Sequence, residues 1–98
     1  TYTVMDAEPG ALTIKLTIRA GEKMSYHSHE HRSEVWIVIS GNGSVVIDDE
    51  EKKVSSGDII SIKQGMKHML IAETNMSIVE VQMGKEISVD DKQKYLRE

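Results

Sequence analysis

The sequence predicts an all-β domain, a sandwich or barrel of seven to nine short strands. Apolar and polar residues alternate with a period of two along much of the chain. Short β-branched runs are separated by turn residues, and no convincing helical pattern occurs before residue 88. The chain has 98 residues, fewer than the roughly 150 of a typical domain, so we expect one domain over residues 1–98.

The first expected strand is Leu12–Arg19, in which leucine and isoleucine alternate with threonine, lysine and arginine. A turn at Gly21 separates it from a short extended piece, Met24–His29. The β-branched run Glu34–Ser40 is the next strand, and it places Trp36 on the same face as the glutamate at its start. We expect Trp36 to fill the interior of the domain.

A glycine-rich turn, Gly41-Asn42-Gly43, ends this strand, and Ser44–Ile47 resumes the extended pattern directly after it. This arrangement is typical of a hairpin, so we expect the strands on either side of the turn to pair. A charged turn, Asp48–Glu51, then leads to a further strand at Lys52–Val54.

Three strands are expected in the second half of the chain, at Ile59–Ile62, Lys67–Glu73 and Met76–Met83. The last segment, Ser88–Glu98, is either one short C-terminal helix, with its first residue or Asp90 as the cap, or an irregular end.

Composition excludes several classes of protein. Twelve Lys and Arg against 16 Asp and Glu give a net charge of −4 with no basic run, so we expect no nucleic-acid partner. The longest apolar run, Val35–Ile39, is too short to cross a membrane. There is no cysteine, so a metal would have to be held by His, Asp or Glu. No signal segment is evident, and we expect a cytoplasmic protein; a core this small favours a homodimer.

Three histidines and one glutamate have the spacing of a metal site. His27 and His29 project from one face of an extended segment because they are two residues apart. Glu34 opens the next strand, and pairing of the two strands at about 4.8 Å would bring its carboxylate beside the imidazoles. His68 follows in a later turn. This nitrogen and oxygen donor set suits one divalent transition metal, Mn, Fe, Co, Ni or Zn. We interpret His31 as a loop residue and not as a metal ligand.

The spacing of these residues resembles the two motifs of the cupin family. The first is Gly21-x5-His27-x-His29-x4-Glu34-x6-Gly41, and the second is Gly57-x5-Lys63-x-Gly65-x2-His68. The second differs from the family at Lys63, where proline is usual, and at Ala72, where asparagine is frequent. The motifs lie within residues 21–41 and 57–72, and the resemblance covers residues 11–83. It implies a small jelly-roll barrel, a double-stranded β-helix, with His27, His29, Glu34 and His68 as metal ligands.

A narrower resemblance involves Met24–Gly41 and Val79–Gly84. These stretches look like the C-terminal isomerase domain of type II phosphomannose isomerases, which is usually fused to a mannose-1-phosphate guanylyltransferase. The resemblance implies metal-dependent interconversion of mannose 6-phosphate and fructose 6-phosphate. Two alternatives remain open: a metal-dependent oxygenase of small molecules, and a barrel that binds a sugar or small anion without turnover.

Two further residues are candidates for catalysis. Arg32 shares the parity of Glu34 and could bind the phosphate of a sugar, or it could be a solvated loop residue. Glu80 is the carboxylate inside an apolar strand; it either lines the cavity and acts as the base or points into solvent. A metal-bound hydroxide and His31 are the other candidates for the proton transfer.

Overall fold

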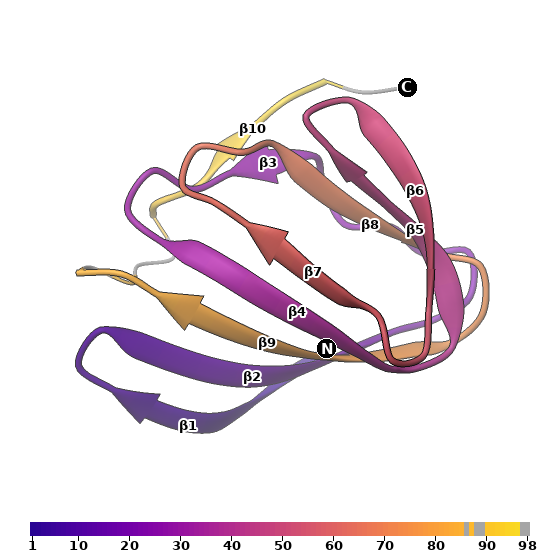
Figure 1. Ribbon diagram of the computed structural model, residues 1–98, viewed down its shortest axis with the longest axis horizontal. Helices are drawn as coiled ribbons and strands as arrows, with labels where there is room; N and C mark the ends of the chain where they lie inside the picture. The colour runs from indigo at the N-terminus through magenta and orange to yellow at the C-terminus, as the bar shows by residue number, and fades with distance from the viewer. Residues whose placement is uncertain (86, 88–89, 97–98) are drawn as a thin grey trace.

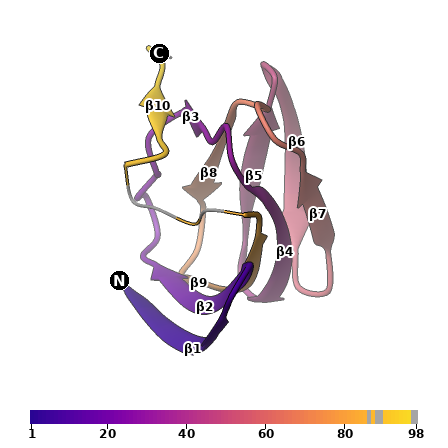
Figure 2. The ribbon, with the colours of Figure 1, turned by 90° about the vertical axis from the view of Figure 1, so that its left-hand side faces the viewer.

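The computed structural model describes residues 1–85, 87 and 90–96, and in these residues the chain forms ten strands in two facing sheets (Figures 1 and 2). The strands are β1 (Tyr2–Glu8), β2 (Ala11–Ile18), β3 (His27–Ser28), β4 (Ser33–Ser40), β5 (Asn42–Ile47), β6 (Glu50–Ser55), β7 (Ile59–Ile62), β8 (His68–Ala72), β9 (Met76–Met83) and β10 (Gln93–Lys94). No helix that could cross a membrane is found in the described part of the chain.

Each sheet contains five antiparallel strands. One has the order β1-β2-β9-β4-β7 and the other the order β10-β3-β8-β5-β6. Apart from the β1–β2 and β5–β6 hairpins, every connection takes the chain from one sheet to the other, so that strands distant in sequence become neighbours. This is the all-β, jelly-roll architecture that the sequence predicts.

The predicted hairpin at the glycine-rich turn is wrong. Strands β4 and β5 lie in different sheets, and β5 pairs with β6 and β8 instead. At Gly41 the chain turns with a φ of +85° and passes so close to the carbonyl oxygen of Asn75 that a Cβ atom would overlap it. A turn signal shows that the chain changes direction, but it does not show whether the chain stays in the same sheet.

The prediction of seven to nine strands is too low, because β1 and β10 were not expected. Strand β1 pairs with β2 at the edge of its sheet and is exposed along its length. Strand β10 pairs with β3 at the edge of the other sheet. The alternative of a C-terminal helix is therefore wrong for residues 90–96, because strand β10 pairs with β3 there. The rest of Ser88–Glu98 lies outside the described residues.

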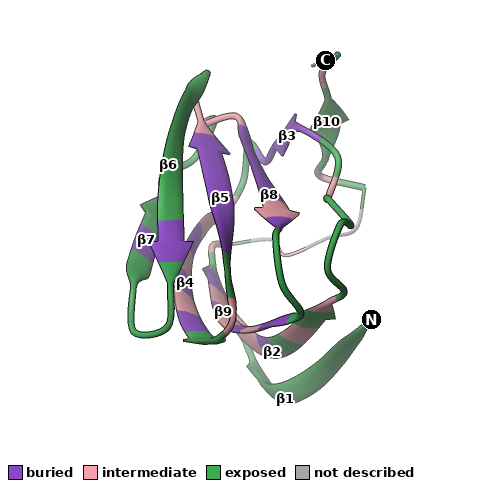
Figure 3. Ribbon diagram, turned by 90° about the vertical axis from the view of Figure 1, so that its right-hand side faces the viewer, coloured by how far each residue is buried: buried purple, intermediate pink, exposed green. Residues whose placement is uncertain are grey.

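The core lies between the two sheets, and Figure 3 shows the buried residues on the inner strands β5, β8, β4 and β9. Trp36 is fully buried, as predicted, and alternate residues of β4 and β9 face inward with it. Burial of each large apolar side chain stabilises the fold by about 1.5–3 kcal/mol. The central members are Trp36, Val38, Val45, Leu70, Ala72, Met76 and Ile78.

Candidate metal centre

Three buried imidazoles meet inside the barrel. His27 in β3 and His68 in β8 are direct partners in the antiparallel pairing of these strands, and their ring centroids lie 4.3 Å apart. His29 follows β3, with its ring 4.8 Å from that of His27 and 5.2 Å from that of His68. Each histidine offers a nitrogen within 4.8 Å of the others, so this group could hold a metal ion.

Backbone carbonyl groups fix the orientation of all three rings. Each Nδ1–H donates to a carbonyl oxygen, so each Nε2 is unprotonated and carries the lone pair that a metal would need. The acceptors are Ser25 (2.6 Å from His27), Asp91 (2.5 Å from His29) and Met66 (3.0 Å from His68). Burial lowers the pKa of each histidine, for His27 to about 3, so the rings are neutral, as metal ligation requires.

Glu34 reaches the imidazoles from the opposite sheet. The expectation that strand pairing would bring it there is wrong, because β3 and β4 belong to different sheets. Its carboxylate instead crosses the interior, with Oε2 3.3 Å from His29 Nε2. Burial would raise the pKa of Glu34, but hydrogen bonds from Glu80 and Trp36 and the charge of Arg32 lower it. Glu34 is therefore an ionised carboxylate inside the barrel.

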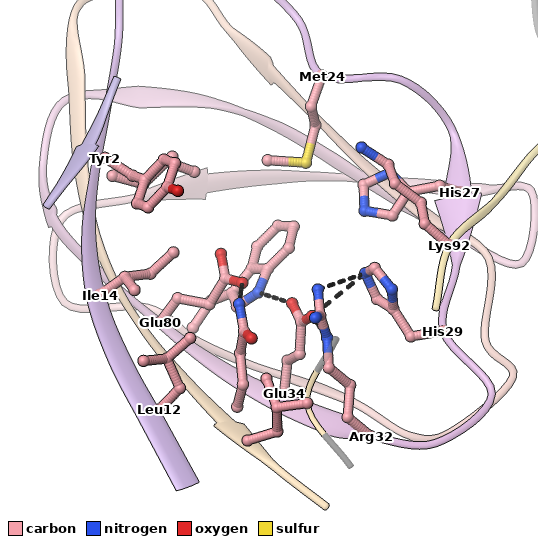
Figure 4. Close-up of a pocket in the computed structure, with 14 residues that line it drawn as sticks. Tyr2, Leu12, Ile14, Met24, His27, His29, Arg32, Glu34, Glu80 and Lys92 are labelled. Atoms are coloured by element: carbon pink, nitrogen blue, oxygen red, sulfur yellow. Dashed lines mark hydrogen bonds and ion pairs between the residues drawn. The ribbon is translucent and has the colours of Figure 1, made fainter. Parts of the chain in front are cut away.

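Arg32 bridges the carboxylate and the imidazole (Figure 4). Its Nε donates to Glu34 Oε2 at 2.8 Å, and its Nη2 donates to His29 Nε2 at 3.0 Å. Two acceptors this close to each other need a cation or a proton donor between them. Arg32 supplies one, so coordination of a metal by all four candidate ligands would require its guanidinium to leave the space between His29 and Glu34.

The donor set fits a divalent metal. Arg32 bridges two of the acceptors. A third acceptor, His68 Nε2, is buried and makes no hydrogen bond to the described residues. A buried polar atom without a partner costs about 1–3 kcal/mol, and a metal ion would satisfy it. Neutral imidazoles with a carboxylate are the ligands that Mn, Fe, Co, Ni and Zn accept.

Glu80 points into the barrel, which decides between the two orientations that the sequence left open. It lies on β9, directly opposite Trp36 in β4, and is buried. Burial, followed by the charge of Glu34, raises the pKa of Glu80 to about 8. The side chain of Gln82 donates to Glu80 Oε1 at 2.9 Å, so the carboxyl group has a fixed position.

A cavity of about 400 Å³ lies in front of these groups, and Figure 4 shows Glu80 and Arg32 on either side of Glu34 within it. His31 is exposed and is not among the described residues that line the cavity, whereas Lys92 from the C-terminal segment is. The lining residues are Tyr2, Leu12, Ile14, Leu16, Met24, His27, His29, Arg32, Glu34, Trp36, Glu80, Gln82, Ile87 and Lys92.

Sequence reasoning did not find Asp91 and Lys92, and it placed Gln82 on the face of Glu80 without giving it a role. Gln82 shares the parity of Glu80, which is a signal that could have identified it. Asp91 and Lys92 carry no local signal, because only the pairing of β10 with β3 brings the end of the chain to the site.

The family model for the C-terminal domain of mannose-6-phosphate isomerase matches residues 1–96. The chain belongs to this family. A mannose-1-phosphate guanylyltransferase of Escherichia coli is 30% identical over 92 residues, which cover 92% of this chain and 19% of that protein. The chain thus spans about a fifth of the length of such curated relatives.

Solved structures show the same fold. A protein of Klebsiella pneumoniae with a double-stranded β-helix domain has a TM-score of 0.86 at 18% identity, over 99% of this chain and 84% of that chain. Salicylate 1,2-dioxygenase of Pseudoaminobacter salicylatoxidans has a TM-score of 0.79 at 22% identity, over 84% of this chain and 24% of that chain. The resemblance to cupins noted in the sequence is confirmed at the level of fold.

Proposed function

We propose that this chain is a metal-dependent sugar-phosphate isomerase domain that interconverts mannose 6-phosphate and fructose 6-phosphate. The observation that carries the proposal is the content of one cavity: candidate metal ligands, a buried carboxyl group in a fixed position, and cationic side chains. These are the parts that an aldose–ketose isomerisation of a phosphorylated sugar requires. Membership of the mannose-6-phosphate isomerase C-terminal family supports the choice of sugar.

His27, His29, His68 and Glu34 would hold the metal. A divalent ion at this position supplies Lewis-acid polarisation of the carbonyl and hydroxyl oxygens of the sugar. Trp36 keeps the carboxylate in place, since its indole Nε1 donates to Glu34 Oε1 at 2.9 Å.

Glu80 is the proposed base. The reaction moves one proton between C1 and C2 of the sugar and a second between O1 and O2. The ionised form of Glu80 would accept the first proton from one carbon and return it to the other. Burial makes Glu80 a stronger proton acceptor than an exposed glutamate. Apolar cavity walls, including Leu12 and Ile14, limit access of water to this carboxyl group. His31 is less suited to the role because it is exposed and does not line the cavity.

Gln82 is proposed to bind a sugar hydroxyl group. Its Nε2 donates to Glu80, while its buried Oε1 makes no hydrogen bond to the described residues. An unsatisfied buried acceptor at a cavity wall is a ready partner for a hydroxyl donor.

The phosphate is proposed to bind between Arg32 and Lys92. Both line the cavity, on the side of the histidines. Arg32 offers a planar group of donors that matches a phosphate, and Lys92 adds a second positive charge. Lys92 forms no ion pair within the described residues, so its charge is available to an anion.

The test is to strip the purified protein with a chelator, reload it separately with Mn, Co, Zn, Ni and Fe(II), and measure isomerisation of mannose 6-phosphate. We expect turnover to return with at least one metal, and unphosphorylated mannose to be a much poorer substrate. Oxygen uptake with Fe(II) is measured in parallel. Oxygen consumption without isomerisation would favour the oxygenase alternative, and metal binding without either activity would favour the binding module.

We also propose that the protein forms a homodimer. Strand β1 lies at a sheet edge and exposes Tyr2, Val4 and Met5, whose exposed fractions are 66%, 52% and 57%. Edge strands with apolar side chains are frequent sites of association, and a second copy offers the same surface. Light scattering coupled to size-exclusion chromatography tests this, and a monomeric mass would contradict it. The cytoplasmic location stays a prediction.

A further inference from the structure

The three histidines differ in what holds their rings. The carbonyl groups that orient His27 and His68 belong to Ser25 and Met66, each two residues earlier in the chain. The carbonyl group that orients His29 belongs to Asp91, which is 62 residues away. Two of the candidate ligands are therefore oriented locally, and the third depends on the C-terminal segment.

Asp91 also holds the backbone that follows His29. Its Oδ1 accepts a hydrogen bond from the amide of Glu30, and its Oδ2 accepts one from the amide of His31, both at 2.9 Å. Together with the bond to the imidazole, a single residue thus makes three hydrogen bonds to His29–His31. The two amides lower the pKa of the Asp91 carboxyl group, although burial opposes them, so the carboxylate is ionised and its bonds are charge-assisted.

The rest of the segment is anchored to β3 separately. The backbone amide of Tyr95 donates to the carbonyl oxygen of Tyr26 at 2.8 Å, and the Tyr95 hydroxyl lies 2.9 Å from Ser28 Oγ. Lys94 pairs with His27 in the β10–β3 ladder. Strand β3 has two residues and lies between β8 and β10, so the chain end is one of its two sheet neighbours.

We propose that Asp91 is a positioning residue for the metal centre, and that it completes the site by holding His29 in its ligating orientation. The proposal rests on the metal-binding part of the proposed function and not on isomerase activity. A ligating histidine binds metal well only when its other ring nitrogen has a fixed acceptor, and loss of such a partner typically weakens metal binding by about 10–100-fold.

The test is the affinity for Co(II), measured by calorimetry, together with the visible absorption spectrum of the bound ion, which reports the geometry of its ligands. Asp91→Ala keeps the carbonyl group that accepts from His29 but removes the two side-chain bonds that hold that carbonyl against the backbone of Glu30 and His31. We therefore expect it to weaken Co(II) binding, by up to about 10–100-fold, and to change the spectrum. Asp91→Asn keeps one side-chain acceptor and should fall between Asp91→Ala and the wild type. If the side chain of Asp91 acted only through its size, Asp91→Asn would bind Co(II) as tightly as the wild type.

Two matched controls separate positioning from general loosening of the chain end. Lys94→Ala changes an exposed side chain of β10, and Tyr95→Phe removes only the hydroxyl contact to Ser28. Both should leave the Co(II) affinity and spectrum unchanged, even where the thermal midpoint of Tyr95→Phe is lower. Equal affinities and spectra for Asp91→Ala and the wild type would overturn the positioning role alone. A wild-type protein that binds no metal would overturn this role and the metal centre together.

Discussion

The two sheets of the barrel bring different chemistry to the same cavity. Strands β3 and β8 of one sheet, with the loop after β3, carry the three imidazoles. Strands β4 and β9 of the other carry Glu34, Trp36, Glu80 and Gln82. The imidazoles are oriented by backbone carbonyl groups, whereas the carboxyl groups are oriented and tuned by neighbouring side chains.

This difference suggests a division of work. A backbone acceptor fixes a neutral ring without adding a charge, which suits a metal ligand. The carboxyl groups are tuned by their surroundings. Arg32 and Trp36 keep Glu34 ionised, whereas burial and the charge of Glu34 raise the pKa of Glu80. We therefore expect substitutions of the histidines in the sheet that contains β3 and β8, here called the imidazole sheet, to change metal binding. Substitutions at Glu80 should change proton transfer alone.

The largest effect is expected for Glu80→Gln, which keeps the shape of the side chain but removes the proton acceptor. We expect kcat for mannose 6-phosphate to fall by about 10²–10⁴-fold, with metal affinity close to that of the wild type. Steady-state kinetics on the metal-loaded enzyme and calorimetry with the same metal measure the two effects. An unchanged kcat would remove Glu80 from the mechanism, and a lost metal would break the division between the sheets.

His68→Ala tests the imidazole sheet. We expect the affinity for Co(II) or Zn(II) to fall by at least about 100-fold, because this substitution removes a ligand and not merely its support. His31→Ala is the matched control, since His31 is exposed and does not line the cavity. The thermal midpoint of the metal-free proteins shows whether the barrel itself is intact. Equal affinities of the two variants would contradict the ligand role of His68.

Gly41→Ala tests the crossing that places β4 and β5 in opposite sheets. A side chain there would combine a φ of +85° with overlap of the Asn75 carbonyl oxygen. We expect the free energy of unfolding, measured in urea, to fall by about 3 kcal/mol or more. Gly57→Ala is the control: its φ is +94° but no atom lies within 4 Å of the added Cβ, so a loss of about 1–2 kcal/mol is expected. Equal losses would show that the close passage does not matter.

The smallest effect is expected for Lys92→Gln. Lys92 lies next to Asp91 in the sequence, but we expect its substitution to leave metal affinity unchanged. We expect KM for mannose 6-phosphate to rise by about 3–10-fold, because loss of one exposed charge contact costs about 1 kcal/mol. Lys94→Gln, two residues later and away from the cavity lining, should change neither. A KM equal to that of the wild type would exclude a phosphate contact by Lys92.

Much of the fold and of the site follows from local sequence. The alternation in residues 12–19, 34–40 and 76–83 determines which side chains share a face, because successive residues of a strand point to opposite sides. It correctly places Trp36 beside Glu34 on an inward face. The spacing of His27, His29, Glu34 and His68 identifies the residues that the structure brings close together.

Only the tertiary structure decides which strands become neighbours and which faces turn inward. The crossing at Gly41, the inward orientation of Glu80 and the bridge from Arg32 to Glu34 and His29 all depend on how the two sheets close around one core. The bond from His29 to Asp91 joins residues 62 positions apart. Local patterns record the backbone conformation of neighbouring residues, whereas pairing across such distances is selected by the burial and hydrogen bonding of the whole barrel.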